Sequence, residues 1–206
     1  MKKQILLFSI ALLFVTASLA QIDKGDILLG GTFGFGNTNA TSGTTTTSSN
    51  ANLHPRLGYA IGRNSVLSLA LGYNYGKSKD VTSNQGSRLN AFSAGVSWQK
   101  FFPIKDKVGW YTDLSATYTN GKIKYQIGSS SPYESKSNGY AAAANPGIYF
   151  MPTPSLLLTS NVGGVSYGYS KDKVGGQPTA KTSNFSINFL SYFGFGVVFI
   201  INKKTD

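Results

Sequence analysis

The chain has 206 residues, enough for one domain of ordinary size, and a formal net charge of +11. Only 13% of its residues are charged, against about 25% in a typical soluble domain. It has no cysteine, which excludes disulfides and a lipid-anchored lipoprotein, and its scattered lysines form no basic stripe of the kind that binds nucleic acid.

The N-terminus is typical of an export signal. Lys2 and Lys3 precede an apolar run from Ile5 to Val15, and small residues follow at Ser18-Leu19-Ala20. The run is shorter than the roughly 20 residues that a membrane-spanning helix needs. The sequence therefore predicts a signal peptide over residues 1–20, cleaved before Gln21, and one exported domain over residues 21–206.

Eight segments after the signal alternate between apolar and polar or small residues. Successive side chains of a strand point to opposite faces, so a strand with lipid on one side shows this period of two. Pro55 and Pro146 interrupt two segments, and Gly163-Gly164 predicts a bulge where the seventh changes parity. The segments are residues 26–35, 52–61, 67–75, 92–99, 110–118, 139–150, 156–169 and 184–201.

The connections between these segments alternate in length. Short turns at residues 62–65, 103–107 and 151–154 are typical of the periplasmic side of outer-membrane barrels, and longer loops are typical of the outer side. The predicted fold is all-β, an eight-stranded antiparallel up-and-down transmembrane β-barrel with both mature ends on the periplasmic side. The long polar loops are predicted at residues 38–51, 76–87, 121–137 and 170–183.

Aromatic residues gather at both predicted rims, as in the aromatic girdles of membrane barrels. A soluble eight-stranded cup would show the same alternation with its apolar face turned inward. The long apolar row of the last segment and the polar or tiny opposite face favour the membrane. The expected girdles are Phe101, Phe102, Trp110, Tyr149 and Phe150 near the short turns, and Phe35, Tyr73, Tyr75, Tyr118, Tyr167 and Tyr169 near the long loops.

With its closing strand Phe193-Gly194-Phe195-Gly196-Val197-Val198-Phe199, the chain resembles the small outer-membrane β-barrel domain family of OmpA/OmpX-like eight-stranded barrels. The resemblance covers nearly all of residues 21–204 and rests on pattern rather than on a unique motif. It implies an aromatic residue near the C-terminus that the outer-membrane assembly machinery reads, a place that Phe199 can take. It also implies location in the bacterial outer membrane.

The inward positions predict a filled lumen rather than a wide pore, because eight strands enclose a space that side chains can fill. Buried charges should pair, so we expect Arg56 to meet Asp113 or Asp26. His54, the only histidine, is expected to be a satisfied interior residue. The predicted polar lining is Asp26, His54, Arg56, Gln99, Tyr111, Asp113, Asn145, Asn188 and Tyr192.

No catalytic, cofactor or metal site is predicted. Glu134 is the sole glutamate, and the glycine run at residues 30–36 is not followed by a helix pattern, which a phosphate loop requires. The first hypothesis is a non-enzymatic membrane protein with a structural or surface-interaction, adhesion-like role. The alternatives are a narrow channel for ions or small solutes and a membrane-embedded lipid hydrolase. Expected partners are outer-membrane lipid, lipopolysaccharide and the assembly machinery, with no nucleic acid and a monomeric barrel.

Overall fold

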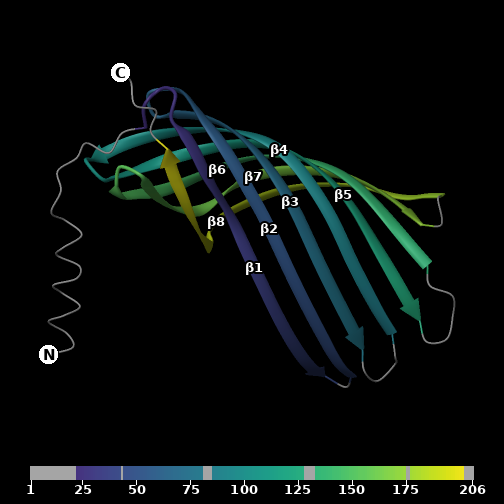
Figure 1. Ribbon diagram of the computed structural model, residues 1–206. Coiled ribbons are helices and arrows are strands. Elements are labelled where there is room, and N and C mark those ends of the chain that lie inside the picture. The colour runs from purple at the N-terminus through teal and green to yellow at the C-terminus, as the bar shows by residue number, and fades with distance from the viewer. Residues whose placement is uncertain (1–21, 43, 81–84, 128–132, 175–176, 202–206) are drawn as a thin grey trace, which may run out of the picture.

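The computed structural model describes residues 22–42, 44–80, 85–127, 133–174 and 177–201. The predicted signal peptide lies outside these residues. Eight strands form one closed barrel in chain order, which confirms the predicted fold class (Figure 1). The strands are β1 (Ile27–Ser42), β2 (Thr44–Gly62), β3 (Ser65–Asp80), β4 (Gln85–Lys105), β5 (Val108–Ile127), β6 (Tyr133–Thr153), β7 (Leu156–Val174) and β8 (Gln177–Ile201).

Two of the three short turns lie within the predicted ranges, and the third lies at the end of its predicted range because β6 continues to Thr153. Each leaves two residues between strands: residues 63–64, 106–107 and 154–155. In the first turn Asn64 has a positive φ of 55°, a conformation that asparagine tolerates better than most residues. Antiparallel neighbours joined by such turns give the up-and-down order of the barrel.

The described parts of the four long connections are strands, so the prediction of loops is wrong for these parts. The pairing continues to Ser42↔Thr44, Asp80↔Gln85, Tyr125↔Tyr133 and Val174↔Gln177. These stretches are polar on both faces and so lack the apolar alternation of a membrane strand, but threonine and tyrosine favour extended backbone. Strands of 16 to 25 residues therefore extend well past the roughly 9–11 residues that cross a bilayer. We call these parts the extracellular hairpins.

The apolar row of each strand faces outward. On β3, Leu69 and Leu71 are 62% and 63% exposed, whereas Val66 and Ser68 on the opposite face are buried. The row runs from Leu67 to Tyr75, nine positions that match the length of a membrane-crossing strand. An apolar exterior on a small closed barrel is what lipid contact requires, so the soluble cup is not the arrangement observed.

The predicted irregularities are accommodated by breaks in pairing. Gly163 has a φ of +116°, and the β7–β8 register shifts between Asn161 and Gly163, which confirms the predicted bulge. The β6–β7 pairing is interrupted between Ala144 and Gly147, where Pro146 has no N–H to donate. Pro55 pairs with Gly31 of β1, but it is absent from the β2–β3 pairs.

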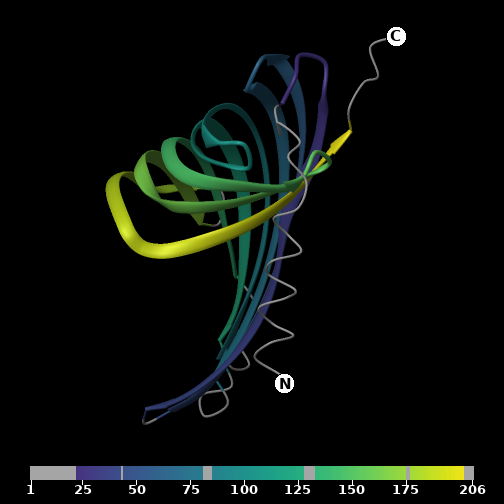
Figure 2. The ribbon, with the colours of Figure 1, turned by 90° about the vertical axis from the view of Figure 1, so that its left-hand side faces the viewer.

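The seam that closes the barrel is short. β1 pairs with β8 only over Ile27–Gly31 and Val197–Ile201, at the periplasmic end, whereas it pairs with β2 along its whole length. Figures 1 and 2 show the two strands diverging beyond this point, with the later hairpins curling away from those of β1–β4. The circumference is therefore complete at the periplasmic end.

Candidate functional site

An apolar plug fills the periplasmic end of the lumen. Segment 22–26 turns into the mouth, where the Gly25 N–H donates to the Ala60 carbonyl and the Asn64 N–H donates to the Ile22 carbonyl, at 2.8 and 2.9 Å. Ile22 is 1% exposed there. The buried cluster consists of Ile22, Leu28, Ala60, Val66, Phe101, Tyr111, Tyr149, Met151, Leu157 and Ile200.

The plug corrects the prediction for two rim aromatics. Phe101 and Tyr149 belong to it, 2% and 4% exposed, rather than to the lipid-facing girdle. Their rings pack edge to face with centroids 5.4 Å apart. Phe102, which faces outward, stacks on Trp110 with centroids 4.0 Å apart. The available sequence signal was the apolar doublets beside the short turns, where alternation stops because both faces of the strand are apolar: Leu28-Leu29, Val66-Leu67, Phe101-Phe102, Tyr149-Phe150, Leu157-Leu158 and Ile200-Ile201.

A polar cavity of about 300 Å³ lies in the lumen beside the plug. Its lining includes Thr159 and Asn161, which were not predicted from the sequence, and the Tyr111 hydroxyl donates to Asn161 Oδ1. Asn188, expected in this lining, is exposed instead, and the side chain of Tyr192 lies outside the described residues. The expected lining residues that do meet here are His54, Arg56, Gln99, Tyr111, Asp113 and Asn145.

One ion pair anchors the cavity. Arg56 Nη1 lies 2.9 Å from Asp113 Oδ2, and the two side chains are 30% and 8% exposed. Asp26 does not join them. Its Oδ2 accepts a 2.9 Å hydrogen bond from the Asp23 N–H and so holds the turn that carries Ile22 into the mouth. The ion pair therefore lies in the cavity, whereas Asp26 lies at the periplasmic mouth.

Removing one member of the pair should cost much more than removing both. Asp113→Leu leaves the Arg56 guanidinium without its counter-ion, and we expect a loss of about 2–3 kcal/mol in the free energy of unfolding. Arg56→Met combined with Asp113→Leu should recover most of that loss, because no unpaired charge remains. Urea unfolding of the four proteins in a double-mutant cycle measures the coupling; additive losses would contradict it.

His54 lies in the same lumen. Its Nε2 is 3.3 Å from Asn74 Nδ2, so an amide is its partner rather than an acid or a hydroxyl.

The described residues contain no group of three His, Cys, Asp or Glu side chains that could hold a metal ion. The described part of the chain also contains no helix long and apolar enough to cross a membrane.

The extracellular hairpins separate their charges between two faces. Directly paired residues of an antiparallel sheet share a face. Lys77 continues the outward row of β3, it pairs with Arg88, and Arg88 pairs with Lys124. Asp80 and Asp172 take the opposite parity and point inward. The outward bases of the described hairpins are Lys77, Lys79, Arg88, Lys122, Lys124, Lys136, Lys171, Lys173 and Lys181.

On β6, Glu134 partly neutralises this face. Its carboxylate lies 2.6 Å from Lys122 Nζ and 3.7 Å from Lys136 Nζ. The hydrogen bond from Lys122 is the main cause that holds the pKa of Glu134 below its ordinary value of 4.5.

The interaction of Glu134 with Lys122 should be visible in a titration. Because the folded pKa is lowered, the stabilisation is fully present above the unfolded pKa and is lost as pH falls through the folded value. Carboxyl-carbon NMR should give Glu134 a pKa below 4.5, and Lys122→Met should raise it. An unchanged pKa in that variant would contradict the assignment; Lys24→Met, at the opposite end of the barrel, is the control.

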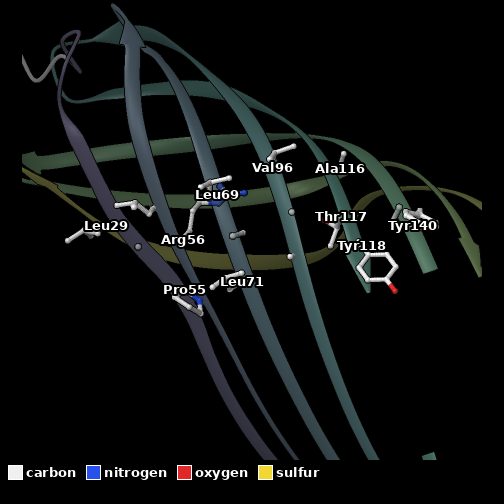
Figure 3. A pocket seen from close by; sticks show the side chains of 16 residues that line it. Leu29, Pro55, Arg56, Leu69, Leu71, Val96, Ala116, Thr117, Tyr118 and Tyr140 are labelled. Atoms are coloured by element: carbon white, nitrogen blue, oxygen red, sulfur yellow. The ribbon is translucent and has the colours of Figure 1, made fainter. Parts of the chain in front are cut away.

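A broad hollow of about 820 Å³ indents the outer wall across β1–β6 (Figure 3). Small residues such as Ala94 and Ala116 form its floor, and exposed apolar side chains such as Leu69 and Tyr140 surround it. Because this wall faces lipid, the hollow is a surface against which acyl chains pack rather than a pocket for a soluble ligand.

The sequence matches the family model of the outer membrane protein beta-barrel domain over residues 6–203. The chain belongs to this family. No curated protein matches the sequence. Membership agrees with the apolar outer wall and the order of the eight strands, and it places the protein among those of the bacterial outer membrane.

Two solved structures of neisserial proteins match this chain. The translocator domain of the autotransporter NalP from Neisseria meningitidis is 16% identical, with a TM-score of 0.50. The alignment covers 87% of this chain and 64% of that one, so the match spans less than two thirds of the NalP domain. Neisserial surface protein A (NspA) is 17% identical with a TM-score of 0.40, over 85% of this chain and 97% of that one. At these identities, the NalP match supports the barrel fold alone.

Proposed function

We propose that this protein is a non-conducting, non-enzymatic barrel that acts through its extracellular hairpins, in a structural or surface-interaction role. The observation that carries the proposal is the plug. An apolar cluster of the described residues, with Ile22 and Phe101 among its members, lies at the periplasmic mouth and supports a lumen closed to hydrated ions. A sealed lumen leaves the outward-projecting hairpins as the part of the molecule that can meet other molecules.

The hairpins suit a binding role because they are paired strands rather than free loops. Tyr125 and Tyr133 stack across β5 and β6 with ring centroids 4.8 Å apart, which stiffens that hairpin. Ser48 and Ser78 hydroxyls bond across β2 and β3 at 3.0 Å. Preorganised surfaces lose less conformational entropy on binding, so rigid hairpins support an adhesion-like role.

Planar-bilayer recording tests the sealed lumen. The purified barrel should give no steady conductance steps, and regular steps would overturn the proposal in favour of a narrow channel. The non-enzymatic part has its own test, mass spectrometry of lipid A incubated with the protein. We expect no change in lipid A, since the partner of His54 is the amide of Asn74. Removal of an acyl chain by wild type but not by His54→Ala would identify a hydrolase instead.

Deletion of the β1–β2 hairpin tip, residues 38–49, tests the surface role. This hairpin is rich in threonine and serine and carries no charge, so its loss leaves the charge pattern of the other hairpins intact. Binding of intact cells to glycan and extracellular-matrix surfaces should fall in the deletion, with the amount of protein in the outer membrane unchanged. If cells bind as well after this deletion, and also after matched deletions of the other hairpin tips, the result contradicts an adhesion-like role.

A further inference from the structure

We propose that the outer wall of β3–β5 is a binding site for a phosphorylated lipid of the outer leaflet. The site has two parts on the same three strands: the apolar hollow holds acyl chains, and the row formed by Lys77, Arg88 and Lys124 binds phosphate. The inference rests on the family and on the lipid-facing wall, and it is independent of the proposed adhesion-like role.

The three bases of the cationic row repel one another when no ligand is bound. Lys77 pairs with Arg88 and Arg88 pairs with Lys124, so three basic residues stand side by side on adjacent strands, with Cβ atoms about 5 Å apart. All three side chains are exposed. Glu134 pairs with Lys124 across β5 and β6 and lowers the charge at that end of the row, but its salt bridges go to Lys122 and Lys136. One shared carboxylate therefore offsets only part of the charge of the row. Like charges placed directly opposite destabilise a sheet, and a bound multivalent anion removes that repulsion.

A cavity of about 540 Å³ lies at this row. Its lining includes Lys77, Lys79, Arg88 and Lys124. Gln126 also lines it and lies on the same outward face, where its amide can donate to phosphate or sugar oxygens. Arginine binds phosphate through paired N–H groups and lysine as a point charge, so the set suits a phosphate monoester.

The spacing between the two parts fits an amphiphile. Leu71 and Ala94, both in the hollow, lie six residues from Lys77 and Arg88 respectively, and Tyr118 lies six residues from Lys124. At about 3.3 Å per residue, that separation is about 20 Å along the strand. The outward residues between them change from aromatic to polar, as at Tyr73 and Tyr75 on β3, which marks the passage from hydrocarbon to head groups.

The occupant is therefore a lipid rather than a soluble polyanion, since a soluble ligand would make no use of the hollow. Figure 3 shows the apolar side chains of the hollow, and the basic row lies farther along the same strands β3–β5. The outer leaflet supplies such a molecule in the phosphorylated glycolipid of lipopolysaccharide.

The test uses the mature chain in zwitterionic micelles, with bis-phosphorylated lipid A as the probe. Ligand that binds the folded barrel raises the temperature at which it unfolds, and the dependence on lipid concentration gives an affinity. Each exposed base near an anionic head group contributes about fivefold, so Lys77→Gln, Arg88→Gln and Lys124→Gln together should weaken binding roughly 100-fold. The control, Lys24→Gln with Lys100→Gln and Lys105→Gln, removes the same charge at the periplasmic end and should bind normally.

Two further measurements test the apolar hollow and the phosphate-binding row separately. Ala116→Phe fills the hollow and should weaken lipid A binding by at least about tenfold, because a displaced chain loses its burial, without changing the weak binding of inorganic phosphate. Dephosphorylated lipid A should bind wild type and the triple variant alike. Equal lipid A affinity of the triple variant and wild type, equal losses in the triple variant and its control, or equally tight binding of a soluble sulfated polysaccharide would each overturn the proposal.

Discussion

Replacing Phe101 with alanine should lower the free energy of unfolding by about 3–5 kcal/mol, because a fully buried ring in a closed cluster is lost. The cavity cannot collapse easily, since the ring is enclosed by Tyr111 and Tyr149, with centroids 5.6 and 5.4 Å away. Urea unfolding in lipid vesicles, followed by the fluorescence of Trp98 and Trp110, measures the change.

The next residue provides the control. Phe102 points to the opposite face, where lipid chains can replace a missing ring, so Phe102→Ala should lose only about 1 kcal/mol from its stacking with Trp110. Equal losses for the two variants would mean that the lumen-facing ring is not part of a packed cluster.

Substituting Gly163 should block the joining of β7 and β8. A Cβ atom at this position would clash with the Asn188 carbonyl oxygen, and the φ of +116° disfavours any L side chain. Strain and the displaced strand together should cost Gly163→Ala at least about 3 kcal/mol. The measurement is the fraction of refolded protein that migrates as a compact band on a gel without boiling.

Gly168, five residues along the same strand, separates the backbone effect from the loss of a glycine. The nearest atom to a Cβ there is the Tyr140 carbonyl oxygen at 3.9 Å, an ordinary contact. Gly168→Ala should therefore change stability by less than about 0.5 kcal/mol. Refolding of Gly163→Ala as efficient as that of Gly168→Ala would show that the bulge is not required.

Much of the barrel could be predicted from the sequence because lipid imposes a simple rule on it. A wall exposed to hydrocarbon needs an apolar residue at every second position, and β3 and β5 show that period without interruption. The rule applies only where one face meets lipid and the other is polar. It fails at the plug, where Phe101 and Phe102 are apolar on both faces, and in the extracellular hairpins, where both faces meet water.

The lumen was predictable to the extent that burial forces charges to pair. Arg56 and Asp113 lie on β2 and β5, which are not neighbours, so their 2.9 Å contact across the lumen depends on barrel closure rather than on any local pattern. The sequence offered two candidate carboxylates on the predicted lumen face, Asp113 and Asp26. The structure gives Asp26 a backbone partner at the mouth, a role that depends on the turn of the N-terminal segment and that alternation does not reveal.

The short seam has a consequence for how rigid each end of the barrel is. The amides that join Ile27–Gly31 to Val197–Ile201 sit against the plug, so they should exchange with deuterium only when the barrel opens globally. Farther along β1, where the described residues pair with β2 alone, exchange should occur through local opening. The circumference is thus fixed at the periplasmic mouth, whereas the outer rim can change its width without disturbing that closed end.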